Sequence, residues 1–173
     1  MLRFLFFLFL LGVEGLSQAH AAQSTSNGSF SMSVAQACRI ASVSALSFGN
    51  YNALGENLES PAGSKGMVSV VCTNGTSTAR VTLSQGGNPE VGSSCSNPLR
   101  RMGNGRGGFL PYGIYQDVNR TLPWGCGSQN GVSLPTFGRT LTPVNLTTFG
   151  TIPAGQPAVV GDYVDTVEVI VTF

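Results

Sequence analysis

Two carboxylates stand three residues apart in the stretch GDYVDT, at Asp162 and Asp165. Paired carboxylates can carry acid–base catalysis, and carboxylate oxygens are ligands that Ca²⁺ prefers. A calcium site needs roughly six to eight oxygens, more than this stretch supplies. Aspartate side chains also accept hydrogen bonds from turn amides. We expect that structural role here rather than catalysis or metal binding.

Histidine, a common general base and metal ligand, occurs once, at His20. It lies in a segment with one base (Arg3), an apolar run over 4–13 and an A-x-A pattern over 19–21. These features are typical of a secretory signal peptide, and the apolar run is well short of the ~20 residues that span a bilayer. We expect residues 1–21 to be removed before Ala22.

Removal of residues 1–21 leaves a chain without histidine. A Ser–His–Asp triad, a Cys–His pair and a histidine-based zinc site are then excluded, so we predict neither an enzyme nor a bound cofactor or metal. One of the nine basic and one of the eight acidic residues leave with the segment, so eight and seven remain. This balance gives no electrostatic reason to expect nucleic acid or an anionic membrane as a partner, and no later segment approaches membrane length.

The Gly-rich stretch GNGRGG over 103–108 could contact an anion through its backbone amides, with Arg100 and Arg101 just before it. It lacks the Lys-Ser or Lys-Thr of a phosphate-binding P-loop, and no helix is expected after it. A flexible hairpin loop is the better interpretation.

Four aromatic residues could form a platform on which a sugar stacks. Aromatic residues of a β-sandwich more often fill its core, and we favour core packing here. The four are Tyr51, Tyr112, Tyr115 and Trp124.

Short apolar stretches between Gly, Asn, Ser and Pro predict an all-β domain. No long stretch has apolar residues at helical spacing without Gly or Pro, so helices longer than a turn or two are not expected. Several short strands with such turns are typical of a sandwich or barrel of antiparallel sheets. The predicted strands are 29–34, 45–51, 66–72, 79–84, 110–117, 146–152 and 165–173.

The last predicted strand, DTVEVIVTF, alternates clearly. Val167, Val169, Val171 and Phe173 share one face, which demands a core on that side. At the edge of a sheet such a strand exposes N–H and C=O groups with which another chain can pair. Periodicity alone predicts no more than an edge strand.

Five stretches resemble one family when they are taken together. They are CRIASVSALSFGNY from Cys38, VVCTNG from Val70, LRRMGNG leading to LPYGIYQD, WGCG from Trp124, and the C-terminal stretch with GDYVDTVEVIVTF. In this order they resemble the spore coat protein U domain family, which includes pilin subunits of archaic chaperone–usher pili. The resemblance covers nearly all of the chain after residue 21.

The resemblance implies an incomplete immunoglobulin-like β-sandwich, completed by a donor strand from a neighbouring subunit. It implies a structural subunit of a bacterial surface pilus that supports adhesion or biofilm formation. The implied partners are a periplasmic chaperone, an outer-membrane usher and other pilin subunits. Val167, Val169, Val171 and Phe173 would then contribute to the edge of an open groove. The alternative function is a secreted spore-coat or carbohydrate-binding surface protein.

Four cysteines suit an oxidising compartment and allow three pairings. Pairing of Cys38 with Cys72 and of Cys95 with Cys126 fits best. The first pair flanks two predicted strands, and members of the resembled family carry a bridge at those positions. No C-x-x-C spacing supports a metal site instead.

We expect residues 22–37 to be an N-terminal extension and residues 38–173 to be the pilin-like domain. In GSFSMSV, Phe30, Met32 and Val34 alternate with serines, a pattern suited to a strand inserted along a groove. The preceding AQSTSN is too polar to insert. The same segment could instead be the first strand of its own domain.

Overall fold

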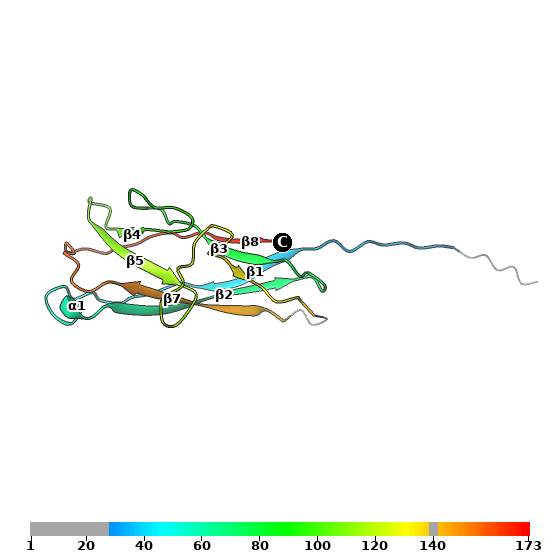
Figure 1. Ribbon diagram of the computed structural model, residues 1–173, viewed down its shortest axis with the longest axis horizontal. Helices are drawn as coiled ribbons and strands as arrows, with labels where there is room; N and C mark the ends of the chain where they lie inside the picture. Colours follow the sequence, from blue (N-terminus) through cyan, green and yellow to red (C-terminus); the bar gives the residue numbers. More distant parts are fainter. Residues whose placement is uncertain (1–27, 139–141) are drawn as a thin grey trace, which may run out of the picture. The chain divides into compact units, whose positions relative to one another are not determined.

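The computed structural model describes residues 28–138 and 142–173, so residues 1–21 of the expected signal peptide lie outside it. The described residues form eight strands and one short helix (Figure 1). The strands are β1 (Cys38–Ser44), β2 (Ala62–Cys72), β3 (Arg80–Leu83), β4 (Arg100–Gly103), β5 (Phe109–Tyr115), β6 (Val132–Ser133), β7 (Val144–Ile152) and β8 (Val169–Thr172), and the helix is α1 (Glu56–Glu59).

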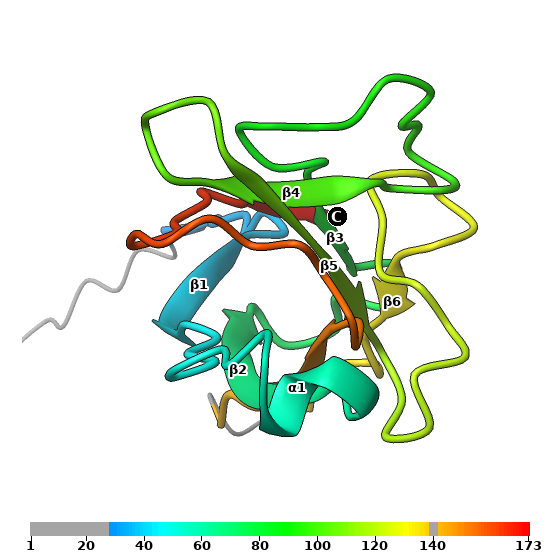
Figure 2. The same ribbon diagram turned by 90° about the vertical axis from the view of Figure 1, so that its left-hand side faces the viewer.

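Two antiparallel sheets make up the compact unit of residues 34–173. The first has the strand order β1-β2-β7-β5-β4 and the second has the order β6-β3-β8 (Figure 2). The expectation of an all-β fold is therefore confirmed. Within the described residues β1 pairs only with β2, and β8 pairs only with β3. Each sheet thus ends in a strand with one unpaired edge.

The core lies between the sheets and receives side chains from β2, β3, β4, β5 and β7. Along β5, buried Leu110, Tyr112 and Ile114 alternate with more exposed residues, as the two-residue period of a strand requires. Trp124 is fully buried, and its indole N–H donates to the Val81 carbonyl at 3.1 Å. The core therefore takes the apolar faces that the sequence pattern predicts.

Five predicted strands are present. Those at 66–72, 79–84, 110–117 and 146–152 correspond to β2, β3, β5 and β7, and β8 occupies the second half of 165–173. Strands β1, β4 and β6 were not predicted. Strand β4 begins with two consecutive arginines, which do not indicate a strand in the sequence, although the Arg100 side chain is buried.

The strand predicted over 45–51 is wrong. The Ser64 hydroxyl of β2 donates to the Ser47 carbonyl at 2.7 Å and accepts from the Ser47 N–H at 3.0 Å. The Ser64 side chain thus occupies the N–H and the C=O of Ser47, which would otherwise pair with a neighbouring strand. Leu46 and Phe48 of this segment still turn inward and pack over Gly150, where an added Cβ would lie 2.8 Å from the Phe48 ring.

The strand predicted over 29–34 is also absent, because residues 28–37 have no strand assignment. Residues 28–33 belong to a unit separate from that of residues 34–173. Phe30 is 100% exposed and Met32 is 89% exposed. The first strand of the described chain is β1.

Two disulfides tie the domain together. Cys38 at the start of β1 is bonded to Cys72 at the end of β2, and the two residues are directly opposite each other in the ladder. Cys95 is bonded to Cys126, which joins the loop after β3 to the loop after β5. The bridges span 34 and 31 residues, and the chain-entropy model assigns about 4 kcal/mol of stability to closure of each loop.

Replacement of both Cys38 and Cys72 by serine should lower the free energy of unfolding by about 4 kcal/mol. That is a large share of the roughly 5 to 15 kcal/mol that holds a domain together. Urea titration of the double variant and the unaltered protein, both without reductant, measures the difference. Peptide mapping of the unaltered protein should link Cys38 to Cys72, and a link from Cys38 to Cys126 would contradict this topology.

Candidate functional site

A groove lies beside the end of β1 and the start of β8. Residues within 43–48, at the end of β1 and just after it, form one wall, and residues within 163–169, which lead into β8, form the other. The cavity has a volume of about 400 Å³. Its floor consists of side chains from both sheets, namely Val68, Leu83, Met102, Tyr112, Ile114 and Thr148.

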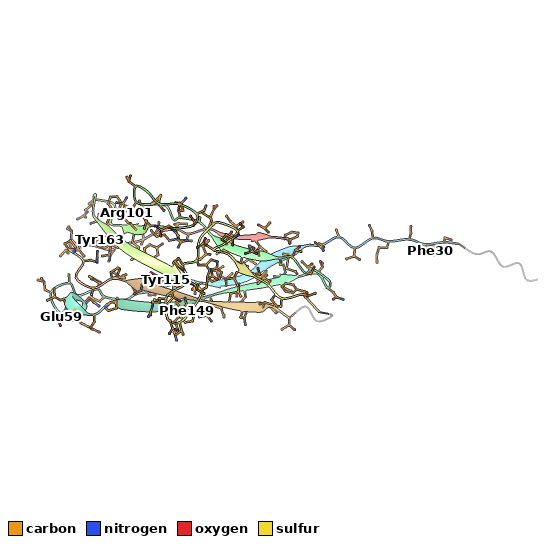
Figure 3. The ribbon with its side chains drawn as sticks, in the orientation of Figure 1. Phe30, Glu59, Arg101, Tyr115, Phe149 and Tyr163 are labelled. Atoms are coloured by element: carbon orange, nitrogen blue, oxygen red, sulfur yellow. A yellow bond between two sulfur atoms is a disulfide. The ribbon has the colours of Figure 1, made fainter. Side chains whose placement is uncertain are left out.

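A second hollow of about 1080 Å³ is lined mainly by residues within 46–54 and 158–163. The two hollows share Leu46, Phe48, Met102 and Tyr163, so they lie next to each other. The second hollow extends toward the end of the sandwich where Figure 3 places Tyr163 and, on α1, Glu59. β8 ends at the other end, where β1 begins (Figure 1).

The two walls run in opposite directions. Residue numbers rise from 43 to 54 along one wall while they fall from 169 to 158 along the other. An extended chain in the groove would therefore lie parallel to one wall and antiparallel to the other. Both arrangements allow backbone hydrogen bonds between strands.

The walls of the groove are apolar but poorly covered. Val43 is 54% exposed although it lines the cavity. Leu46, Phe48, Val167 and Val169 pack against the core yet stay only partly buried. These side chains have a core on one side and no layer of protein on the other. The groove is thus an apolar surface of the kind that marks a binding site.

The sequence-predicted residues divide into three groups. Val167 and Val169 line the groove. Val171 packs against the core opposite Val81, outside the lining, and Phe173 is 48% exposed beyond β8. Phe30 and Met32 lie in the separate N-terminal unit, and Val34, 77% exposed, is the first residue of the compact unit 34–173.

Sequence reasoning missed the wall opposite β8. Val43, Leu46 and Phe48 supply its apolar side chains. The alternation of Leu46 and Phe48 was visible, but it predicted a paired strand rather than one wall of a groove. The role of Asp165 in the other wall was also missed.

Asp165 is a fixed acidic residue in the lining of the first hollow. The Tyr112 hydroxyl donates to its Oδ2 at 2.6 Å, and the Gly87 N–H donates to its Oδ1 at 2.8 Å. Burial, together with this hydrogen bond, raises the pKa of Tyr112, so the hydroxyl keeps its proton and remains a donor. The bonds connect the groove wall to β5 and to the loop after β3. Asp162, in contrast, is exposed beside the second hollow.

Buried Arg100 joins the ends of three segments. Its guanidinium donates to the carbonyls of Leu83, Ser84 and Trp124 at distances between 2.5 and 3.2 Å. Burial lowers the pKa of this guanidinium, whereas the nearby Tyr112 and Asp165 act to raise that pKa. These bonds hold β4 beside the end of β3, which explains how an arginine-rich stretch forms a partly buried strand at the end of the first sheet.

The last segment of the chain crosses from one sheet to the other. Gly103 at the end of β4 and Val164 exchange two backbone hydrogen bonds at 2.9 and 3.0 Å. From Val169 onward the segment pairs with β3 instead. Asp165 lies at the start of this crossing, so its hydrogen bonds position the wall between the two pairings.

Other candidate chemistry finds little support in residues 28–138 and 142–173. No helix there is long and apolar enough to cross a membrane, and no three His, Cys, Asp or Glu side chains gather as metal ligands. GNGRGG forms the hairpin between β4 and β5, where Asn104 accepts from the N–H groups of Arg106 and Gly108. Trp124 and Tyr112 are buried, so they cannot form a sugar platform.

Comparison with known proteins identifies the family. The model of the Spore Coat Protein U domain matches residues 24–170. The chain belongs to the spore coat protein U domain family. It is also 40% identical over 167 residues to Protein U of Myxococcus xanthus, with 91% of this chain and 89% of that protein covered.

A solved structure shares the fold. It is the pre-assembly complex of the chaperone CsuC with the tip adhesion subunit CsuE from archaic chaperone–usher Csu pili of Acinetobacter baumannii. The TM-score is 0.54 at 26% identity, and the match covers 81% of this chain but 40% of the other. The curled antiparallel sheets of this spore coat U domain are consistent with the immunoglobulin-like fold of such pilins.

Replacement of Tyr112 by phenylalanine should destabilise the spore coat U domain by about 1–2 kcal/mol. A hydrogen bond to a charged group contributes about 1.5–3 kcal/mol, and Asp165 would keep the Gly87 N–H as a donor. Urea titration measures the change. Tyr115→Phe is the matched control, and it should change the free energy of unfolding by no more than about 0.5 kcal/mol. Tyr115 of β5 is partly exposed and lies beside Phe149 of β7 (Figure 3). Equal stability of the two variants would contradict the role of the Tyr112 hydroxyl.

Proposed function

We propose that this chain is a structural subunit of a bacterial surface pilus of the archaic chaperone–usher type. The observation that carries the proposal is the open apolar groove between the segments 43–48 and 163–169, next to the unpaired edges of β1 and β8. A strand inserted there would pair with both edges and cover the apolar floor. The family and the fold shared with a chain of the CsuC–CsuE complex support this assignment.

The proposed occupant of the groove is the N-terminal extension, residues 22–37, of a second copy. Its candidate donor residues Phe30, Met32 and Val34 are exposed in the described chain. Full burial of one such side chain contributes roughly 1.5 to 3 kcal/mol, and backbone pairing adds to this. Because groove and extension are different surfaces of one chain, the contact is head-to-tail and generates a filament.

The same groove requires protection before assembly. Unpaired edges and an uncovered apolar floor expose a folded subunit to aggregation. A periplasmic chaperone would cover the groove with a strand of its own, and an outer-membrane usher would exchange that strand for the extension of the next subunit. The subunit would thus pass through the periplasm to a pilus on the cell surface, where it supports adhesion or biofilm formation.

A spore-coat protein is the second candidate function, because the identity to Protein U is higher and more complete than that to the pilus protein. Electron microscopy with a labelled antibody to this chain separates the two. Labelled surface filaments support the pilus subunit. Label confined to a spore coat, without filaments, supports the second candidate.

Replacement of Phe30 and Met32 by aspartate should abolish polymerisation and leave a folded, chaperone-bound monomer. Only the contact with the neighbour is lost, because two carboxylates cannot be buried unpaired in an apolar groove. Size-exclusion chromatography of periplasmic extracts measures polymer and complex. The matched control, Ser29→Asp with Ser31→Asp, puts the same charges on the other face of the strand and should still polymerise. Failure of the Phe30/Met32 variant to fold or bind chaperone would show that the segment belongs to its own domain.

Replacement of Val169 by aspartate should abolish recovery of the chaperone complex. Val169 lines the groove, and its replacement puts an unpaired carboxylate in the apolar surface. A periplasmic pull-down of the tagged chain measures the complex. Ile170→Asp is the control, since Ile170 is the next residue along β8 and lies 42% exposed on the opposite face. Undiminished recovery with Val169→Asp would contradict a chaperone strand in this groove.

A further inference from the structure

The groove carries charge of a single sign. Among the residues that line its two hollows, the charged ones are Asp165 and Asp162, and neither lysine nor arginine takes part. Asp162 is exposed to solvent, which screens its charge. Asp165 lies beside the apolar floor of the first hollow, where screening is weaker. The groove therefore has one acidic position at which the charge of an occupant matters most.

Asp165 cannot easily turn away from an occupant. Its carboxylate accepts from the Tyr112 hydroxyl and the Gly87 N–H, and the loop after β3 packs so closely that a Cβ at Gly86 would overlap it. Arg100 carries a positive charge that interacts with the negative charge of Asp165. Its hydrogen bonds go to main-chain carbonyls, and it does not line the groove. An incoming side chain in the groove thus meets the carboxylate before it meets the guanidinium.

The proposed occupant matches this charge pattern. Residues 22–37 contain neither an acidic nor a basic residue. The two strands at the groove edges differ, because β1 contains Arg39 and the segment leading into β8 contains Asp165 and Glu168. An exposed edge can pair with any strand of suitable pattern, so some property must distinguish the extension from acidic strands.

We propose that Asp165 is a specificity-determining residue of the groove: it rejects strands with an acidic side chain beside it and so favours the uncharged N-terminal segment of a second copy. The inference rests on the proposed donor-strand function. Two carboxylates roughly 6 to 12 Å apart at an effective dielectric constant of about 20 repel enough to weaken binding by on the order of ten- to a hundred-fold.

A test must separate this repulsion from the cost of dehydration. Any acid loses hydration when it enters an apolar groove, whether or not Asp165 is present. The informative quantity is the ratio of affinities for Glu-containing and Gln-containing strands, compared between grooves with and without the Asp165 charge. This comparison isolates the pairwise coupling.

The acceptor in the test is the full mature chain with Phe30→Asp and Met32→Asp, which cannot serve as its own donor. The probes are fluorescent peptides of residues 24–37 in which position 30, 32 or 34 is replaced in turn by Glu, Gln or Lys. Fluorescence anisotropy gives their affinities for this acceptor and for the acceptor that also carries Asp165→Asn. Asparagine keeps an oxygen that can accept from the Gly87 N–H. Glu168→Gln is the matched control, because it removes an exposed carboxylate on the other face of the same segment.

We expect one of the three positions to lie beside Asp165. There Glu should bind at least about tenfold more weakly than Gln, Asp165→Asn should remove most of that difference, and Glu168→Gln should leave it unchanged. If Asp165→Asn does not fold, the unaltered groove still decides the matter, because Lys should bind more tightly than Glu at that position alone.

Two results would overturn the inference. Equal weakening by Glu and Lys at all three positions would show that only dehydration acts, as would a Glu-to-Gln ratio that Asp165→Asn does not change. The donor-strand proposal survives both results. If the peptide with the unaltered sequence does not bind at all, the donor-strand proposal itself is contradicted, and the specificity of Asp165 is rejected with it.

Discussion

The unsatisfied backbone at the edges of β1 and β8 is the constraint on which the rest of the structure depends. Buried N–H and C=O groups must find partners, and a sheet that ends in an open edge leaves a row of them without one. Here two such edges lie next to one groove, whose floor consists of side chains from both sheets. The described part of the domain therefore leaves an apolar surface beside its two unpaired edges that its own strands do not cover.

The groove keeps its shape because polar contacts hold its walls. On one side, Ser64 fastens the segment after β1 through both backbone groups of Ser47, and the absence of a side chain at Gly150 leaves space for the aromatic ring of Phe48. On the other side, the Tyr112–Asp165 hydrogen bond fixes the point where the last segment changes sheets. Both walls are thus held by hydrogen bonds within the chain. A preorganised site of this kind would lose little conformational entropy if a strand entered it.

Periodicity predicted the parts of the fold that the core determines. Strands β2, β5 and β7 follow from alternating apolar residues, because one face of each is buried whatever the pairing. The segment 45–51 shows where such reasoning fails, since its alternation is real but its hydrogen bonds go to a serine hydroxyl. Strand β4 was not predicted, because it lacks apolar alternation in the sequence. Its Arg100 is buried only because three distant carbonyls accept its hydrogen bonds. Val167 and Val169 could be placed at the groove from the sequence and family resemblance, whereas its opposite wall and Asp165 required the tertiary structure.

The position of the Cys38–Cys72 bridge has a mechanical consequence. The bridge joins the first residue of β1 to the last residue of β2, at the point where the N-terminal extension meets the domain. A pull on the chain ahead of Cys38 passes through a covalent bond into β2, an interior strand flanked by β1 and β7. The hydrogen bonds of β1 are therefore not loaded one after another from its end, as they would be if the strand were peeled. Tension applied through the extension is shared by the ladders on both sides of β2.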